Sequence, residues 1–181
     1  MRIYVPATLD ELEDATVVAG GARWDLPARQ VHAVTAALAT ALPDDDEEGR
    51  EYAAFLAAAD DSLALVAARP GVPPLRVVVS VDVADGVVAP AAAAPGEDVA
   101  ESAVEVAGVP GVEIVAVHVD EPEAADDVRA VLAAADEEND ADSVAALGAT
   151  SGGALDEALE RVTDRDLLWY DPTELASIPR P

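Results

Sequence analysis

The segment from Leu75 to Val83 constrains the fold more than any other part of this sequence. It reads LRVVVSVDV, the longest β-branched run in the chain, and it lies between Pro73-Pro74 and Asp85-Gly86. Prolines and Asp-Gly pairs interrupt regular structure, whereas β-branched residues favour strands. We therefore expect a central buried strand here, with the other elements arranged around it.

The two faces of this expected strand differ in chemistry. Successive side chains of a strand point to opposite faces of the sheet. One face would carry only the aliphatic side chains found at every second position from Leu75 to Val83. The other face would carry Arg76, Val78, Ser80 and Asp82. We expect the first face to be core, and the second face is the only place where the fold and a possible chemistry meet.

The remaining pattern predicts one α/β domain over residues 1–181, with an α+β arrangement as the alternative. Strands are predicted at residues 2–5, 30–34, 103–107 and 113–119. Helices are predicted after caps at Thr8 and Thr35, over 48–69, from Pro122 onward and over 155–162. Irregular segments are expected at 85–100, which is rich in Ala and Pro, at 136–143, and in a C-terminal tail at 172–181. This order indicates a mixed sheet of four to five strands packed with helices, and it leaves the strand order open.

The composition excludes several function classes. The net charge is −27 and the chain contains neither lysine nor cysteine. A surface of this sign repels nucleic-acid phosphates and anionic membranes, so we expect neither as a partner. The absence of cysteine removes disulfides and thiolate chemistry, and no cofactor fingerprint occurs. The N-terminus has no signal-peptide pattern, so we expect a cytoplasmic location.

Several short motifs together carry a resemblance to a known family. They are MRIYVPATL at 1–9, AVTAAL at 33–38, EYAA at 51–54, VHVD at 117–120 and LLWY at 167–170. In their order and spacing, the chain resembles a family of short actinobacterial proteins of unknown function. In that family a His-Glu pair tends to precede the Leu-Leu-Trp motif, where this chain has Arg165-Asp166. The resemblance implies a cytoplasmic domain and supplies no activity, cofactor or catalytic residue.

Four polar residues on two expected strands form the main candidate for a catalytic site. If the strands containing Ser80 and His118 are parallel neighbours, then Ser80, Asp82, His118 and Asp120 gather near their C-terminal ends, where ligands bind in open α/β sheets. His118 would act as a general base oriented by Asp82 or Asp120, with Ser80 as nucleophile, or the set would hold a divalent metal. The alternative is structural, with Asp82 serving a turn and Asp120 capping a helix.

Other polar patterns give weaker hypotheses. His32 and His118 sharing a metal is one. The acidic runs at 44–48 and 136–140 alternate like calcium loops, but Phe55 and Leu147 stand where a bidentate Glu is required. We interpret both runs as solvated helix ends. Residues 150–153, Thr-Ser-Gly-Gly, are interpreted as a cap and turn rather than an anion site.

The motif at 167–170 concentrates aromatic area near the C-terminus. Trp169 either docks into the domain or, with Tyr170, anchors an interface, because Trp and Tyr are enriched in binding hot spots. Trp24, placed in a loop, allows the same two interpretations. We expect a non-enzymatic protein that acts through contact with an unidentified protein partner. The alternative is a small hydrolase or metal-dependent enzyme using Asp82, His118 and Asp120.

Overall fold

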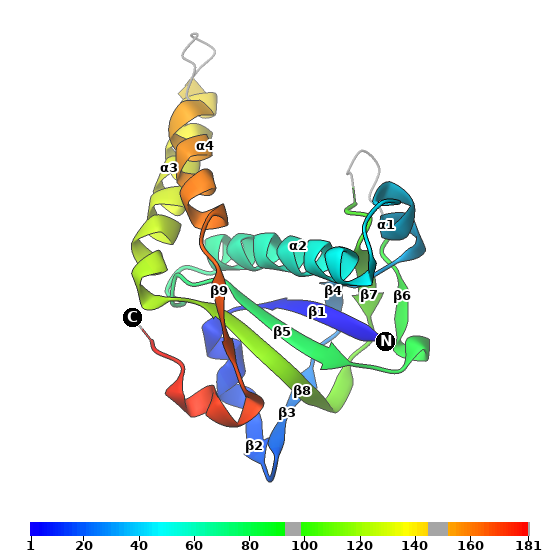
Figure 1. Cartoon of the computed structure of the whole chain (residues 1–181). Helices are drawn as coiled ribbons and strands as arrows, with labels where there is room; N and C mark the ends of the chain where they lie inside the picture. Colours follow the sequence, from blue (N-terminus) through cyan, green and yellow to red (C-terminus); the bar gives the residue numbers. More distant parts are fainter. Residues whose placement is uncertain (93–98, 145–151, 181) are drawn as a thin grey trace.

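The computed structural model describes residues 1–92, 99–144 and 152–180 and builds them around one large sheet (Figure 1). The nine strands among these residues follow the order β2-β3-β8-β5-β1-β4-β7-β6, with β9 beside β8. Their bounds are β1 (Arg2–Ala7), β2 (Thr16–Val18), β3 (Gly21–Leu26), β4 (Arg29–His32), β5 (Val77–Asp82), β6 (Val88–Pro90), β7 (Ala103–Val106), β8 (Val109–Asp120) and β9 (Leu167–Tyr170).

All pairings between the described strands are antiparallel. The prediction of a mixed sheet of four to five strands is therefore wrong in both direction and number. The predicted combination of helices with a sheet is correct, and the antiparallel pairing of the described strands fits the α+β alternative. Parallel neighbours need a long crossover, usually a helix. Between β5 and β8 the described chain instead forms the short 3-10 helix η2 (Asp85–Val87) and strands β6 and β7.

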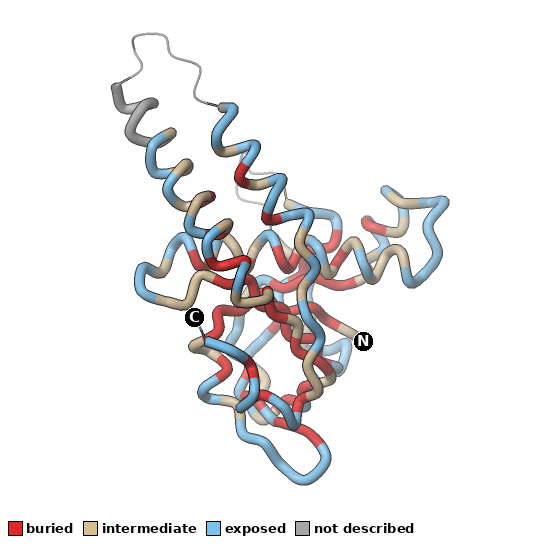
Figure 2. The backbone as a smooth tube through the Cα atoms, turned by 60° about the vertical axis from the view of Figure 1, so that its left-hand side comes forward, coloured by how far each residue is buried: buried red, intermediate tan, exposed pale blue. Residues whose placement is uncertain are grey.

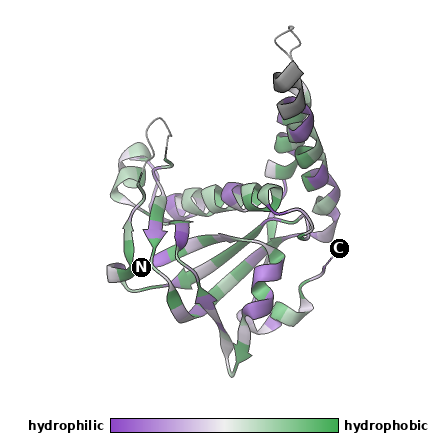
Figure 3. Cartoon of the chain, turned by 180° about the vertical axis from the view of Figure 1, so that it is seen from behind, coloured by the Kyte–Doolittle hydropathy of each residue, from purple (hydrophilic) through white to green (hydrophobic). Residues whose placement is uncertain are grey.

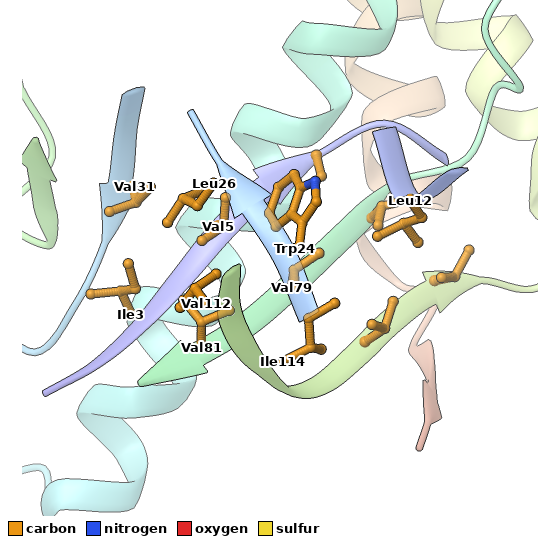
Figure 4. Close-up of a cluster of buried hydrophobic side chains, with 14 of the residues drawn as sticks. Ile3, Val5, Leu12, Trp24, Leu26, Val31, Val79, Val81, Val112 and Ile114 are labelled. Atoms are coloured by element: carbon orange, nitrogen blue, oxygen red, sulfur yellow. The ribbon is translucent and has the colours of Figure 1, made fainter. Parts of the chain in front are cut away.

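The central-strand prediction is confirmed. β5 lies between β1 and β8, and its aliphatic face is fully buried in the main core. Val79 and Val81 pack there with Ile3 and Val5 of β1 and with Ile114 of β8 (Figure 4). Seen from behind, the central strands carry mostly hydrophobic residues (Figure 3). The long apolar run of β5 thus fits a strand that has a partner on each side and core beneath it.

Trp24 belongs to this core, and its placement in a loop was wrong. It is 3% exposed and lies in β3. Gly20-Gly21 connects β2 to β3 as a hairpin, and Gly20 has a φ of 85°, a conformation that L side chains rarely adopt. The Gly20-Gly21 pair therefore forms a turn between two strands. The helix predicted after Thr8 is the 3-10 helix η1 (Leu9–Asp14), and the Glu11 carboxylate accepts a hydrogen bond from the Thr8 N–H (3.0 Å).

Helix α2 (Glu47–Ala68) crosses the opposite face of the sheet (Figure 1). The predicted span of 48–69 is correct within a residue. The apolar spacing along the helix predicts a buried face of six residues, namely Tyr52, Phe55, Leu56, Ala59, Leu63 and Val66. The helix fully buries only Ala59 and Val66 of this set. Its buried residues are mainly small, namely Ala54, Ala58, Ala59, Ser62 and Val66, whereas Tyr52 and Leu56 are exposed. The Ser62 hydroxyl donates to the Ala7 carbonyl and accepts from the Val77 N–H, both at 2.7 Å. Small residues therefore let the helix approach the sheet closely, and the large ones lie at its margin.

Two further helices, α3 (Ala125–Val144) and α4 (Gly152–Thr163), pack side by side and extend away from the sheet (Figures 1 and 2). A short 3-10 helix, η3 (Pro122–Ala124), precedes α3, and helix α1 (Ala36–Ala41) begins after the predicted Thr35 cap. The acidic segment 136–143 is helical within α3, so the loop predicted there is wrong. In the predicted tail, η4 (Pro172–Ser177) buries Leu175. Part of the predicted 85–100 loop forms η2 and β6, and residues 93–98 lie outside the described ranges.

Candidate functional site

A pocket of about 660 Å³ opens where the first turns of α2, the sheet and β9 meet. Its floor is the non-aliphatic face of the central strands. Tyr4, Ser80 and Ala116 lie opposite one another across β1, β5 and β8. In the next row Val78 faces His118, which in turn faces Trp169 of β9. The pocket therefore occupies the face on which the sequence placed a possible chemistry.

Aromatic side chains dominate this pocket. The chain has six aromatic residues, namely two Trp, three Tyr and one Phe. Four of them line the pocket, and they are Tyr4, Tyr52, Phe55 and Trp169. The Phe55 ring stacks on Tyr52 at 6.1 Å between centroids and meets Tyr4 edge-on at 6.2 Å. The main core, by contrast, consists largely of Val, Leu, Ile and Ala.

His118 contributes the imidazole of the site. Its ring meets Phe55 edge-on at 4.8 Å, and its Nδ1 is buried without a hydrogen-bond partner in the described part of the chain. Burial lowers the pKa of His118 below its usual value, because a low-dielectric surrounding disfavours the charged form. At neutral pH His118 is therefore mainly an uncharged ring in an aromatic environment, and its buried Nδ1 has no hydrogen-bond partner among the described residues.

The antiparallel sheet separates the four residues proposed as a catalytic set. Ser80 and His118 both line the pocket, but Asp82 and Asp120 do not. Asp82 ends β5, and its exposed carboxylate binds Arg2 (Nε to Oδ1, 2.7 Å). Asp120 ends β8, which runs the opposite way, so it lies beside the residue preceding β5. The expected convergence at one sheet edge was therefore wrong, because it depended on parallel strands.

Asp120 forms a buried ion pair instead of capping a helix. Its Oδ1 accepts from Arg76 Nη2 at 2.8 Å, its Oδ2 accepts from Arg76 Nε at 3.1 Å, and Oδ2 also accepts from the Arg76 backbone N–H at 2.8 Å. The Asp120 side chain is 0% exposed and that of Arg76 is 4% exposed. Arg76 Nη2 also donates to the Arg165 carbonyl at 3.0 Å. The pair therefore joins β5, β8 and the segment before β9.

The arginines that line the pocket have ion-pair partners, whereas the carboxylates that line it have none among the described residues. Its three arginines each bind carboxylates outside the lining: Arg2 binds Asp82, Arg76 binds Asp120, and Arg165 binds Asp127 (2.6 Å) and Glu121. The lining carboxylates of Glu48, Glu51 and Asp166 form no ion pair with any described residue. Burial, aided by the negative charge of Glu51, raises the pKa of Tyr4 to about 12. The pocket is therefore aromatic, and its surroundings are net acidic once the carboxylates that bind the three arginines are counted.

The predicted interface residues lie on opposite faces of β9. Trp169 lines the pocket and is 59% exposed, so it is not docked in the core as one interpretation held. Tyr170 packs partly buried against the main core. The sequence reasoning missed Tyr4, Tyr52 and Phe55 as site residues. The only signal was the spacing of Tyr52 and Phe55, which also fits a buried helix face.

The second histidine belongs to a separate buried network. His32 of β4 is 1% exposed. Its Nδ1 lies 2.8 Å from the Ser102 hydroxyl and its Nε2 lies 2.9 Å from Asp61 Oδ2 of α2. The hypothesis of a metal shared by His32 and His118 finds no support in this geometry. The described residues contain no group of three or more His, Asp or Glu side chains arranged to hold a metal ion.

The remaining acidic and glycine-rich motifs have ordinary local roles where the structure describes them. Asp46 caps α2, because its Oδ1 accepts from the Gly49 N–H at 2.9 Å. The acidic run at 136–140 lies within α3 rather than at a helix end. Of the 150–153 motif, Thr150 and Ser151 lie outside the described residues, and Gly152 begins α4. No helix in the described ranges combines the length and apolar character that crossing a membrane requires.

Comparison with known proteins assigns the chain to a family without assigning an activity. Neither the curated proteins nor the solved structures contain a match to it. A family model described as "Family of unknown function (DUF6912)" matches residues 1–178, which is nearly the whole chain. This agrees with the resemblance seen in the short motifs. The chain therefore belongs to the DUF6912 family of unknown function.

Proposed function

We propose that the protein is non-enzymatic and acts by binding another protein through the aromatic pocket. The name aromatic pocket here means the cavity lined by Tyr4, Tyr52, Phe55, His118 and Trp169. One observation carries the proposal. A chain with six aromatic residues places four of them around one open cavity and leaves Tyr52 56% and Trp169 59% exposed.

The cost of this exposure supports a binding role. Burying a large apolar side chain stabilises a folded protein by about 1.5–3 kcal/mol. Tyr52 and Trp169 give the fold only part of this stabilisation, because more than half of each side chain is exposed. The same holds for Leu56, which lines the same pocket and is 36% exposed. Aromatic side chains grouped in this way supply a large contact area with little loss of conformational entropy, which is why they are enriched at interfaces. A partner that covers the pocket would recover that burial.

Site-specific photocrosslinking tests the proposal. A benzophenone amino acid would replace Tyr52 in the full chain, expressed in the organism that encodes it. The matched control carries the same group at Val17, an exposed apolar residue of β2 that is 46% exposed and outside the pocket. We expect a discrete adduct from position 52 only, and we expect Trp169→Ala to abolish it. Identical adducts from both positions, or none from position 52, would contradict the proposal.

A second candidate function rests on His118. A neutral imidazole with a free Nδ1, in a pocket also lined by Ser80, has the components of a general-base site. The original enzyme hypothesis needed Asp82 or Asp120 to orient the ring, and both carboxylates are bound to arginines. Hydrolysis of a panel of activated esters tests this candidate. Activity that follows the His118 titration and disappears in His118→Gln would favour it over the binding role.

A further inference from the structure

The electrostatics of the aromatic pocket restrict what can occupy it. Each lining arginine is already neutralised by a carboxylate outside the pocket, as the pairs to Asp82, Asp120 and Asp127 show. Glu48 and Glu51 project from the first turns of α2 without an ion-pair partner in the described chain. Glu51 is half-buried, so its charge is screened less by water than that of a fully exposed carboxylate. The pocket therefore favours a cation.

The aromatic rings favour the same kind of occupant. The face of a Trp, Tyr or Phe ring is electronegative and attracts a cationic group within about 6 Å of its centre. Tyr52 and Phe55 stack on the α2 side, and Trp169 lies across the pocket on β9. An aromatic surface alone would also suit an apolar side chain. Unpaired carboxylates beside the rings distinguish this pocket, because burying them under an apolar group would remove their hydration without compensation.

We propose that the aromatic pocket binds a cationic side chain, Arg or Lys, of the partner protein. This inference rests on the proposed function and specifies the chemistry of the partner at this site. The planar guanidinium of arginine fits best, because it stacks on aromatic rings and donates two parallel hydrogen bonds to a carboxylate such as Glu51. The chain's net charge of −27 would also draw a basic partner towards this face.

A peptide titration tests the inference without knowledge of the partner. The probe is a capped Gly-Gly-Arg-Gly-Gly peptide, and its matched controls replace Arg by citrulline, which keeps the shape but lacks the charge, or by Glu. The readout is the pair of indole N–H signals in the nitrogen-15 NMR spectrum of the full chain. Trp169 lies in the pocket, whereas Trp24 is 3% exposed in the core and serves as an internal reference. We expect the arginine peptide to shift the Trp169 signal alone.

Charge-neutralising variants complete the test. Glu51→Gln should weaken binding of the arginine peptide about three- to fivefold. Glu137→Gln removes the same charge from an exposed position on α3 outside the pocket and should leave binding unchanged. Equal binding of the citrulline peptide, preferential binding of the Glu peptide, or an unaltered affinity in Glu51→Gln would overturn the inference.

The two proposals can fail separately. Photocrosslinks that form from position 52, together with equal binding of the arginine and citrulline peptides, would retain the protein-binding function and reject the cationic occupant. Specific binding of the arginine peptide without any crosslinked protein would support a cation site and reject the protein partner.

Discussion

At the scale of single residues, Asp120 gives the sharpest prediction of stability. Its carboxylate is fully buried and accepts hydrogen bonds from the side chain and backbone of Arg76. Removing one partner of a buried pair leaves an uncompensated charge and typically costs about 3–5 kcal/mol. We therefore expect Asp120→Asn to lower the free energy of unfolding by about that amount, as measured by urea denaturation.

The chain provides a matched control at the other end of β5. Asp82 binds Arg2 in the same way, but its side chain is 58% exposed. Exposed pairs contribute about 0–1 kcal/mol, because water screens both charges. Asp82→Asn should therefore change the free energy of unfolding by less than about 1 kcal/mol. Similar losses in both variants would show that burial does not govern these pairs.

Protonation of His118, which lines the aromatic pocket, makes the stability of the fold depend on pH. Its pKa is lowered in the folded protein by burial, so the unfolded chain binds the proton more readily. The contribution of the uncharged His118 ring to stability is therefore fully present above the pKa of histidine in the unfolded chain, about 6.5. This contribution is lost as the pH falls to the lower pKa that His118 has in the folded protein. We expect the NMR titration of His118 to have a midpoint below about 6.5. His118→Gln should flatten the pH dependence of stability in that window, and an unchanged slope would contradict this assignment.

The sequence could identify these residues but could not predict their partners. The alternation around Ser80 and Asp82 placed each side chain on the correct face. Whether Asp82 and Asp120 meet depends on whether β5 and β8 run parallel or antiparallel. The relative direction of the two strands is set by how the intervening chain connects them. The one available signal was in the sequence of 84–108, which is rich in Ala and Pro and shows no long helical pattern, because a parallel pair needs a long crossover, usually a helix.

At the scale of elements, α2 shows why residue size did not predict its buried face. Its buried side is made chiefly of alanine and serine, and Ala58 is 0% exposed against the sheet. Overfilling a packed contact of this kind typically costs about 1–3 kcal/mol. We expect Ala58→Leu to lower the free energy of unfolding by that amount in urea denaturation.

Tyr52 on the same helix gives the opposite expectation. It was predicted to face the core but is 56% exposed in the aromatic pocket. Tyr52→Ala should therefore change the free energy of unfolding by about 0.5 kcal/mol or less. If Tyr52→Ala were the more destabilising of the two substitutions, α2 would be rotated so that its large side chains face the sheet.

The short strands that lie next to a turn or within an aromatic motif were also hard to predict. β2 and β3 lie on either side of the Gly20 turn, and the residues of β9 were interpreted as a docking segment or an interface anchor, but not as a strand. A strand of three or four residues carries too few side chains for alternation to be distinguished from chance. The long strand β5 and the long helix α2 were predictable because each repeats its pattern several times.

At the scale of the whole molecule, charge is the property that both the fold and the proposed binding must accommodate. The chain carries 37 acidic residues against 10 arginines, so most carboxylates have no cation to bind. Their mutual repulsion destabilises the compact state. Raising the salt concentration from about 10 mM to about 0.5 M shortens the range of that repulsion from about 30 Å to below 8 Å.

Salt should therefore act on stability and on binding in opposite directions. We expect the thermal midpoint of the free protein to rise with sodium chloride, because screening relieves repulsion among many unpaired carboxylates more than it weakens the few arginine pairs. The same salt should weaken binding of the arginine peptide to the aromatic pocket. Calorimetry and the Trp169 titration measure the two effects in the same buffers, with sucrose at matched osmolality as the uncharged control. A thermal midpoint that falls with salt would mean that the arginine pairs, rather than the net charge, dominate the electrostatic free energy of this fold.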